Sequence, residues 1–421
     1  MIVIVGAGLA GAKAAEALRD EGYRERILMI GDEEERPYTR PPLSKDYLRG
    51  RSEKAKIYAH PAGWYQEHGI ELRLGKRVTA VDPARHRVTL AGTLAPGESI
   101  GYDKLLLCTG ASARTVNASV GATGQVLTLR SVADCERMRE SFATGARRGQ
   151  RVTVVGAGWL GLEVAAAARD AGLEVTLVAR GELPLLGGFG PEIASVFARL
   201  HRNHGVTLRV GAGVVGIRDQ AAGDSVGPGV IRRIAVELDD GSSIQTDLVV
   251  VAIGATPNDQ LAAAAGLAVG DGIHVDEQLR TSDPDIFAAG DVASVYHPLL
   301  RRRLRFAHWH TAATQPRVVA KSMLGEAASY QQVPYFYSDQ YELGMECAGH
   351  LEPGGYDEVV IRGDLDAPRF IAFWLKDHVV LAGMNVNIWT ETQRIKALIR
   401  SGITVESAKL ADSSVPLPGA H

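Results

Sequence analysis

The chain has 421 residues, of which 46% are apolar and 23% are charged, with a net charge of −3. This length and apolar content predict two or three domains with sizeable cores rather than a disordered chain. The small acidic excess argues against a protein that binds nucleic acid or an anionic membrane through its overall charge. The three cysteines, Cys108, Cys135 and Cys347, form no CxxC pair, zinc spacing or disulfide framework, so we expect no dithiol chemistry.

No apolar run approaches the roughly 20 residues that a membrane-spanning helix needs. The longest such run, residues 248–255, has the length of a buried strand. Met1 leads directly into the apolar residues 2–5, without the basic region or cleavage site of a signal peptide. We therefore expect a soluble protein in the reducing cytoplasm.

Residues 1–32 follow the order strand, glycine-rich turn, alanine-rich helix and strand. The turn is a GxGxxG motif formed by Gly6, Gly8 and Gly11. In a dinucleotide-binding βαβ unit the first glycine allows the tight turn, the second lets the backbone approach a pyrophosphate, and the third lets the helix pack closely on the strand. Asp32 follows Gly11 by 21 residues, near the distance at which an acid binds ribose hydroxyl groups. The alternative is that Asp32 belongs to an acidic surface turn.

Residues 151–180 repeat this plan. The second GxGxxG motif is formed by Gly156, Gly158 and Gly161. Two such units indicate two nucleotides, or one nucleotide and a decayed copy. Ala179 and Arg180 end the second strand, where an acid favours the 2′-hydroxyl of NAD and an arginine can pair with the 2′-phosphate of NADP. We therefore predict NADP(H) over NAD(H); the alternative is that Arg180 points into solvent.

Three further apolar segments end in small residues, at 102–110, 247–258 and 281–291. Each is expected to be a strand that ends at a cofactor, where a glycine such as Gly254 lets the backbone approach closely. From about residue 320 the composition changes to aromatic-rich strands, PYFYSDQY and FIAFWLK, and a helix, ETQRIKALIRSG, which indicate an α+β domain. Residues 412–421 are expected to form a loose tail.

Taken together, these segments resemble the FAD-dependent ferredoxin reductases of bacterial oxygenase systems. The resemblance is carried, in family order over nearly the whole chain, by GAGLAG, GDEEERPYTRPPLSKDYL, YDKLLLCTG, VVGAGWLGLEVA, TSDPDIFAAGD, YSDQYEL and GMNVNIW. It implies an α/β fold like that of glutathione reductase, with two Rossmann-like nucleotide-binding domains and a C-terminal α+β domain. The implied FAD domain covers residues 1–112 and 246–320, the NAD(P) domain 113–245, and the C-terminal domain 321–421.

The resemblance also implies which residues touch the cofactors. Those expected to hold FAD are Gly6, Gly8, Ala10, Gly11, Asp32, Lys45, Val78, Arg130, Asp291 and Trp309. Asp291 has a rationale of its own, because an acid at a strand end can hold the ribityl hydroxyl groups. Apart from the resemblance, the second GxGxxG motif (Gly156, Gly158 and Gly161) and Arg180 are expected to hold the nicotinamide nucleotide, and Gly254, near the end of its strand, is expected to contact a cofactor.

Two residues are candidates for the redox centre. By resemblance the Lys45 ammonium lies beside the flavin, where a cation stabilises negative charge on the reduced ring. Its alternative is a surface lysine in a charged stretch. Glu163, in the first turn of its helix, is implied to face the nicotinamide and to pair with Lys45, although a carboxylate there is also favoured by the helix dipole alone.

The sequence departs from the family pattern in three places. Ala179 and Arg180 replace the usual acid, Tyr335 and Tyr337 replace tryptophans, and His308 precedes Trp309 in an altered helix start. These changes affect the nicotinamide pocket and the partner surface. His308 and His310 have no third ligand at suitable spacing, so we assign no metal.

The sequence thus predicts an oxidoreductase that passes electrons from NAD(P)H through FAD to a small acidic ferredoxin serving an oxygenase such as a cytochrome P450. The arginines at 301, 302, 303 and 305 are a candidate docking patch for that ferredoxin, or a solvated loop. The alternatives are an NAD(P)H oxidase or quinone reductase without a protein acceptor, and a flavoprotein whose binding to partners is gated by its redox state. Monomer and homodimer both remain open.

Overall fold

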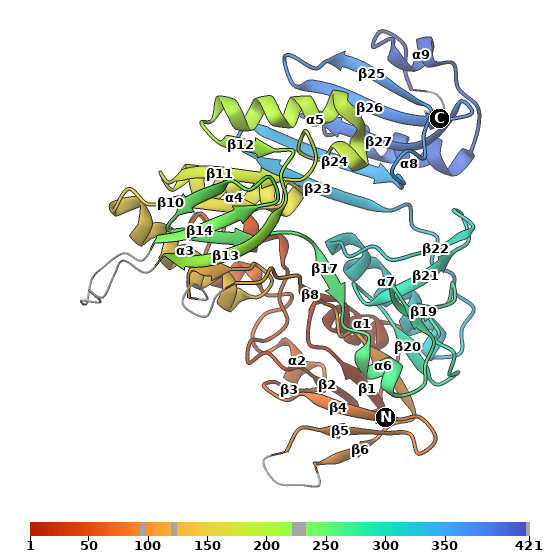
Figure 1. Cartoon of the computed structure of the whole chain (residues 1–421). Helices are drawn as coiled ribbons and strands as arrows, with labels where there is room; N and C mark the ends of the chain where they lie inside the picture. The colour runs from red at the N-terminus through yellow and green to blue at the C-terminus, as the bar shows by residue number, and fades with distance from the viewer. Residues whose placement is uncertain (93–96, 119–123, 221–232, 418–421) are drawn as a thin grey trace. The chain divides into compact units, whose positions relative to one another are not determined.

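The computed structural model describes residues 1–92, 97–118, 124–220 and 233–417 (Figure 1). Its contacts group the chain into two compact units. The first unit consists of residues 1–40, 54–112 and 256–334, and the second of residues 41–53, 113–255 and 335–421.

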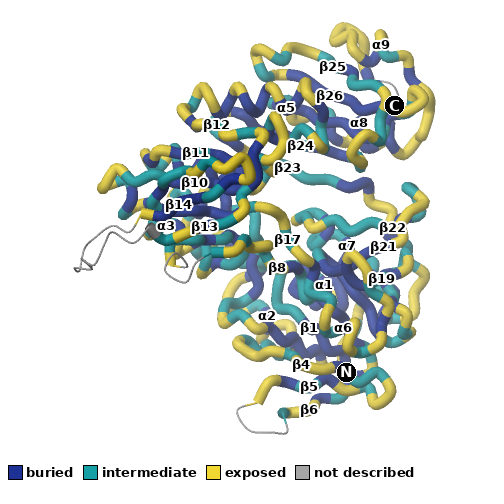
Figure 2. Tube along the Cα trace, in the orientation of Figure 1, coloured by how far each residue is buried: buried dark blue, intermediate teal, exposed yellow. Residues whose placement is uncertain are grey.

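The first unit is built on a parallel sheet with the strand order β20-β7-β1-β2-β3. Its strands are β1 (Ile2–Val5), β2 (Ile27–Ile30), β3 (Ile70–Arg73), β7 (Lys104–Leu107) and β20 (Ile286–Ala288). Helix α1 (Leu9–Asp20) packs against α7 (Trp309–Met323). All residues of β1 and β2 are buried, as an apolar strand covered on both faces requires (Figure 2).

Smaller elements complete the first unit. An antiparallel sheet contains β4 (Val78–Asp82), β5 (Arg87–Leu90) and β6 (Ser99–Gly101). A four-stranded sheet contains β18 (Val269–Gly270), β19 (Gly272–Val275), β21 (Ala293–His297) and β22 (Arg302–Leu304). The short helices are α2 (Trp64–Glu67), α6 (Gln260–Ala264) and the 3₁₀ turn η2 (Lys54–Ile57). Strand β8 (Ala111–Ala113) pairs with β17 (Ala255–Pro257) where the chain passes from one unit to the other.

The second unit repeats the parallel plan with the strand order β12-β11-β10-β16-β9. Its strands are β9 (Val126–Leu127), β10 (Arg151–Val155), β11 (Glu174–Ala179), β12 (Thr207–Val210) and β16 (Leu248–Val251). Its helices are α3 (Val132–Arg147), α4 (Trp159–Asp170) and α5 (Leu186–Asn203), together with the turn η1 (Pro41–Ser44). An antiparallel sheet of β13 (Val214–Gln220), β14 (Arg233–Leu238) and β15 (Ser243–Thr246) shares its core.

The aromatic-rich C-terminal segment also lies in the second unit. It forms an antiparallel sheet with the order β23-β24-β27-β26-β25, made of β23 (Tyr335–Gln340), β24 (Leu343–Gly349), β25 (Glu358–Asp364), β26 (Arg369–Lys376) and β27 (Val379–Val386). Helices α8 (Thr392–Ser401) and α9 (Ser407–Ala411) follow. The predicted fold class, with two parallel nucleotide-binding cores and a C-terminal α+β part, is confirmed.

The observed units differ from the expected domain boundaries at the C-terminal part, where residues 321–334 group with the first unit and residues 335–421 with the second. They also differ at β16 and at residues 41–53. Strand β16 is hydrogen-bonded to β10 and so belongs with the second parallel sheet, although residues 246–320 were expected with the first. Residues 41–53 also group with the second unit, where the Arg49 guanidinium pairs with Asp170 of α4 at 2.8 Å. Which nucleotide each part holds stays a prediction.

The expected loose tail also differs from the structure. The Arg362 guanidinium donates to the backbone carbonyl groups of Asp412 and Val415, at 2.5 Å each, and Leu417 is buried. Residues 412–417 are therefore tied to β25, and residues 418–421 lie outside the described part of the chain. Within that described part, no helix combines the length and the apolar character that a bilayer crossing requires.

Candidate functional site

The two GxGxxG turns have the same steric environment. Gly6 and Gly156 have φ values of +116° and +106°, and a Cβ atom on them would lie 2.1 Å and 2.4 Å from the carbonyl oxygens of Cys108 and Ala252. Both positions therefore require glycine, because an L side chain at such a φ would be strained and would clash.

In both motifs the third glycine is crowded at its Cβ position, whereas the second glycine is not. A Cβ on Gly11 or Gly161 would lie about 2 Å from the carbonyl oxygen of the first glycine of its motif. At Gly8 and Gly158 a Cβ would meet nothing within 4 Å. The second glycine of each motif thus faces open space, which is where a pyrophosphate would approach.

Each open glycine is also the N-cap of a helix. Gly8 precedes α1 and Gly158 precedes α4, and neither helix start receives a side-chain cap. The first backbone N–H groups of α1 and α4 are therefore available to an anion, and the helix dipole adds a partial positive charge. The donors and the shape of both turns fit a dinucleotide pyrophosphate.

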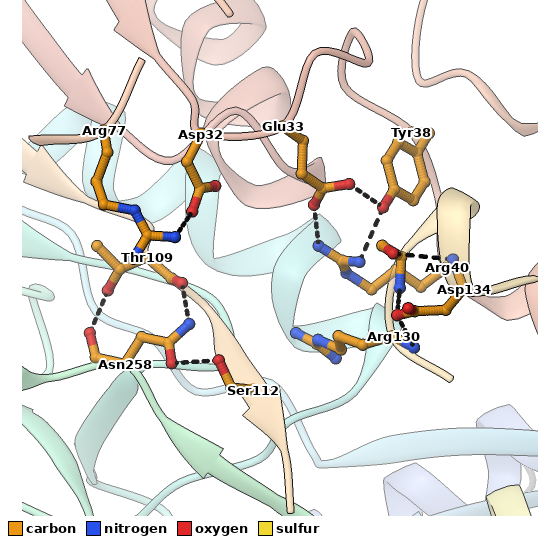
Figure 3. A network of polar contacts seen from close by, with 11 residues as sticks. Asp32, Glu33, Tyr38, Arg40, Arg77, Thr109, Ser112, Arg130, Asp134 and Asn258 are labelled. Carbon is orange, nitrogen blue, oxygen red and sulfur yellow. Dashed lines mark hydrogen bonds and ion pairs between the residues drawn. The ribbon is translucent and has the colours of Figure 1, made fainter. Parts of the chain in front are cut away.

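Asp32 follows β2 at the edge of the first turn and pairs with an arginine that the sequence analysis did not single out. Arg77 Nη2 lies 2.8 Å from Asp32 Oδ2, and both side chains are more than half exposed (Figure 3). Val78, the next residue, begins β4 and packs on the core of the first unit. The structure therefore brings Asp32 and Val78 to neighbouring segments of the first unit.

Glu33, the acidic residue directly after Asp32, is bound by two neighbouring side chains. The Tyr38 hydroxyl donates to Glu33 Oε2 at 2.6 Å, and Arg40 Nη2 donates to Glu33 Oε1 at 3.2 Å (Figure 3). Burial acts to lower the pKa of the Arg40 guanidinium, but the charges of Tyr38, Glu33 and Asp291 outweigh it and raise that pKa. Arg40 is thus a cation fixed by Glu33, and it lies in the same unit as Asp291.

Asp291 lies beside the first glycine turn. Gly290, with φ +81°, approaches so closely that a Cβ on it would lie 2.8 Å from the Ala10 Cβ. Its backbone N–H donates to Gln315 of α7 at 2.7 Å. The structure therefore places Ala10 and Asp291 together, while Trp309 begins α7 with 41% of its surface exposed.

In the second unit, Arg180 follows the last residue of β11 and is exposed. A Cβ added to Gly213 would lie 2.7 Å from Arg180 Nε and 2.6 Å from Asp239 Oδ2, so the side chain runs along this glycine. Gly254, with φ +101°, has open space at its Cβ position. Arg130 precedes Ser131, the N-cap of α3, and its N–H donates to Asp134 at 3.1 Å (Figure 3).

Lys45 and Glu163 form a buried ion pair within the second unit. Lys45 Nζ lies 2.7 Å from Glu163 Oε1, and the two side chains are 12% and 6% exposed. The Glu163 carboxylate also accepts hydrogen bonds from the Ser44 hydroxyl and from the Ser338 hydroxyl, the latter at 2.6 Å. The serine of the PPLSK segment and a serine of β23 thus share the carboxylate with Lys45.

The changed aromatic positions of β23 adjoin this pair. Lys45 Nζ lies 5.2 Å from the centre of the Tyr337 ring, within the range of a cation–π contact. Burial, with smaller effects of the Asp339 and Glu163 charges, raises the pKa of the Tyr337 hydroxyl to about 12. Burial also raises the pKa of Asp339, against the charge of Lys45 and together with that of Glu163.

Among the four arginines at 301, 302, 303 and 305, Arg303 and Arg305 are bound to other groups of the protein. Arg303 donates to the carbonyl groups of Val275 and Ser294, and Arg305 pairs with Asp271. Of the four arginines, those at 301, 302 and 303 are exposed. The residues that the structure describes include no group of three histidine, cysteine or acidic side chains that could hold a metal ion.

The cysteines carry no disulfide. Cys108, Cys135 and Cys347 are all free and buried. Burial raises the pKa of the Cys108 and Cys135 thiols to about 12, and that of Cys347 further. None has the exposed, low-pKa environment of a reactive thiol.

These features, two turns that fit a dinucleotide pyrophosphate, a buried Lys–Glu pair and three free cysteines, are those of a dinucleotide-binding protein without a disulfide. The family model for pyridine nucleotide-disulphide oxidoreductases matches residues 1–315, and that for the reductase C-terminal domain matches residues 335–420. The chain therefore belongs to the pyridine nucleotide-disulphide oxidoreductase family, whose members bind FAD and a pyridine nucleotide.

Several curated relatives are named as ferredoxin reductases or their components. The chain is 36% identical to putidaredoxin reductase of Pseudomonas putida, over 99% of this chain and 95% of that protein. It is 39% identical to the ferredoxin–NAD(+) reductase component of the anthranilate 1,2-dioxygenase system of Burkholderia cepacia, over 99% and 98%. The crystal structure of a covalent putidaredoxin reductase–putidaredoxin complex matches with a TM-score of 0.90 and 36% identity, over 99% of this chain and 96% of that one. The predicted family is confirmed.

Proposed function

We propose that this protein transfers electrons from NAD(P)H through FAD to a small ferredoxin that serves an oxygenase. The observation that carries the proposal is the pair of glycine turns, alike in φ and in steric environment, one in each unit. The two turns supply separate pyrophosphate sites for FAD and for the nicotinamide nucleotide. When bound, the flavin accepts a hydride from the nicotinamide and passes electrons on singly.

In the first unit, Gly6, Gly8, Ala10 and Gly11 bind the FAD pyrophosphate, and Asp32 accepts hydrogen bonds from the adenosine ribose. Asp291 holds the ribityl chain, next to Gly290, which packs closely on Ala10 of the first turn. Three more residues complete the proposed FAD contacts, namely Val78, Trp309 and Arg130. The proposed FAD and NAD(P) domains follow the boundaries expected from the sequence, adjusted so that β16 stays with the second parallel sheet.

Lys45 and Glu163 are proposed as the charged pair of the redox centre. Lys45 supplies the cation that stabilises negative charge on the reduced flavin, and Glu163 faces the nicotinamide. Their burial and the 2.7 Å contact support this proposal. Lys45→Met and Glu163→Gln should each slow flavin reduction by NAD(P)H, whereas Lys56→Met, in the exposed turn η2, should not. Unchanged reduction rates in both variants would refute this role.

We also propose that NADPH is preferred to NADH. Arg180 is exposed at the end of β11, in the second unit with Gly156, Gly158, Gly161 and Gly254. A guanidinium at that strand end can pair with the 2′-phosphate of NADPH, and Ala179 stands at the strand-end position where an acid favours the 2′-hydroxyl of NAD. The ratio of kcat/KM values for NADPH and NADH measures this preference, and a strong preference for NADH would refute it.

The acceptor is proposed to be a small acidic ferredoxin that approaches near residues 301–305. Arg301 and Arg302 are exposed, whereas the Arg305 guanidinium forms an ion pair with Asp271. Reversing both, in Arg301→Glu with Arg302→Glu, should raise the KM for ferredoxin and weaken its salt dependence. Unchanged KM values would exclude this segment as the docking patch. The buried, free thiols are consistent with a reducing compartment such as the cytoplasm.

The experiment that tests the function is anaerobic reduction of the purified protein by NADPH and by NADH, followed by addition of ferredoxin. Bleaching of the flavin and its recovery on adding ferredoxin support the proposal. Fast reduction of ferricyanide without ferredoxin turnover would indicate an oxidase or quinone reductase. Negligible turnover with every acceptor, together with a long-lived reduced complex, would indicate a redox-gated binding protein.

A further inference from the structure

Four buried polar side chains of the second unit form a continuous line of hydrogen bonds that ends on Glu163. His201 Nε2 lies 2.9 Å from Gln340 Oε1, Gln340 Nε2 donates to Ser338 Oγ at 3.0 Å, and Ser338 Oγ donates to Glu163 Oε1 at 2.6 Å. The exposed fractions of His201, Gln340, Ser338 and Glu163 are 0%, 0%, 1% and 5%. The line crosses three elements, from α5 through β23 to α4.

The direction of every donor in this line follows from Glu163. Its carboxylate accepts from Lys45, Ser44 and Ser338, and three donors on two oxygens fit an ionised carboxylate, which only accepts. The single hydroxyl hydrogen of Ser338 is therefore used toward Glu163. Its oxygen must then receive a hydrogen from Gln340, which fixes the amide with its nitrogen toward Ser338.

The same reasoning fixes the histidine. Since the amide nitrogen of Gln340 faces Ser338, its oxygen faces His201 and needs a donor there, so the ring carries its hydrogen on Nε2. His201 Nδ1 is buried without a hydrogen-bond partner among the described residues, and a hydrogen on it would be an unsatisfied buried donor. Burial lowers the pKa of His201 to about 4, which keeps the ring neutral.

The turn between β23 and β24 holds this line in register. Tyr341, with φ +53°, stacks on His204, the C-cap of α5, at 3.7 Å between ring centres, and its ring contacts His201 edge-on at 5.3 Å. Glu342 pairs with His204 at 2.8 Å. The hairpin is thereby fixed to the C-terminal end of α5, the helix that contains His201.

We propose that His201, Gln340 and Ser338 are positioning residues, a one-way chain of donors through which β23 and α5 hold the Glu163 carboxylate as an anion against Lys45. A buried polar chain is costly where its donors lack acceptors, and here each donor in turn has one: His201 donates to Gln340, Gln340 to Ser338, and Ser338 to the carboxylate. The C-terminal sheet therefore contributes to the charged pair itself. This inference rests on the role proposed above for Lys45 and Glu163.

The tautomer of His201 tests the direction of the chain without reference to turnover. In holoenzyme labelled with ¹⁵N-histidine, the ring signals of His201 are assigned by their loss in His201→Gln. We expect a hydrogen on Nε2 and a bare Nδ1. A hydrogen on Nδ1, or on both nitrogens at neutral pH, would overturn the proposal.

A pair of variants tests the positioning role. The glutamine amide of His201→Gln can place a donor where Nε2 stands, whereas the shorter amide of His201→Asn reaches only the Nδ1 position. Both remove the same ring, so both should lower the thermal midpoint, but only His201→Asn should lower kcat, by roughly tenfold for one lost hydrogen bond to the chain. Equal kcat losses in both variants, or no loss in either, would overturn the role.

Failure of this inference and failure of the proposed function can be told apart. If Glu163→Gln and Lys45→Met leave flavin reduction unchanged while His201 carries its hydrogen on Nε2, the proposed role of the charged pair fails and the chain of donors stands. If those variants slow reduction while the hydrogen lies on Nδ1, the role of the pair stands and the chain fails.

Discussion

The two kinds of glycine in the second turn predict opposite phenotypes for the same substitution. Gly156→Ala forces a non-glycine residue to φ +106° and sets its Cβ 2.4 Å from the Ala252 carbonyl oxygen. Strain of about 1–3 kcal/mol and overpacking of about 1–3 kcal/mol predict a loss of roughly 2–6 kcal/mol in the free energy of unfolding. This variant should therefore unfold at a clearly lower temperature.

Gly158→Ala should instead leave stability nearly unchanged and weaken the binding of NADPH. Its φ of −80° suits alanine, and the new methyl group meets no protein atom within 4 Å. The gain of about 0.4–1 kcal/mol from a stiffer unfolded chain roughly offsets the poorer N-cap, so the unfolding free energy should change by less than about 1 kcal/mol. The methyl group instead occupies the approach of the pyrophosphate, and losing one backbone contact to that anion should raise the Kd for NADPH by about tenfold or more.

The assay is a thermal unfolding scan of each variant, together with a titration of NADPH. Gly172→Ala is the matched control, because Gly172 has φ +87° with nothing near its Cβ position and lies at the far end of α4 from the turn. It should lose stability and keep its NADPH affinity. If Gly158→Ala binds NADPH as tightly as the unmodified protein, the second turn is not the pyrophosphate site.

Three further outcomes follow from single features. Arg180→Ala should lower kcat/KM for NADPH by about tenfold or more and leave that for NADH unchanged, whereas Arg202→Ala, an exposed arginine on α5, should affect neither. The native protein should not react with a thiol reagent at pH 8, because its three thiols are buried and burial raises their pKa. On unfolding, all three thiols should react. A reactive thiol in the native state would contradict their burial. Burial lowers the pKa of His201 to about 4, so below about pH 6.5 the unfolded chain binds more protons than the folded protein does. Acidification to pH 4 should therefore lower the free energy of unfolding by up to roughly 3 kcal/mol, and by less in His201→Gln. Equal pH dependence in the two proteins would contradict the buried neutral ring.

The local parts of the fold could be predicted from the sequence. A strand, a GxGxxG turn and a helix are consecutive, and the close approaches at Gly11 and Gly161 are to the first glycine of the same motif. Those at Gly6 and Gly156 are to the carbonyl groups of Cys108 and Ala252, which are distant in sequence. The strand β23, the strand β26 and the helix α8 lie within a residue or two of their expected positions, because their apolar patterns are strong.

The assembled parts could not be predicted without the fold. Ser338 and Glu163 are 175 residues apart in sequence, and no pattern in the chain shows that β23 delivers a hydroxyl group to α4. Arg77 is 45 residues from Asp32, and an isolated arginine carries no signal of its partner. The grouping of residues 41–53 with the second unit likewise depends on side-chain pairs, such as that of Arg49 with Asp170, that form only after folding.

The expected tail shows the same limit in reverse. A composition rich in serine, proline and glycine suggested that residues 412–421 are loose, but an arginine of β25 binds the backbone of this segment as far as Val415. Backbone carbonyl groups accept hydrogen bonds whatever their side chains, so composition could not reveal the attachment.

The central claim is that two glycine turns hold a flavin and a nicotinamide nucleotide in series before a ferredoxin. The most direct measurement is the visible absorbance of the purified protein under anaerobic conditions, first with NADPH and then with an oxidised ferredoxin. The account predicts a flavin spectrum that bleaches with NADPH and returns as the ferredoxin is reduced. A protein that stays colourless when refolded with excess FAD, or a reduced flavin that no ferredoxin reoxidises, would contradict it.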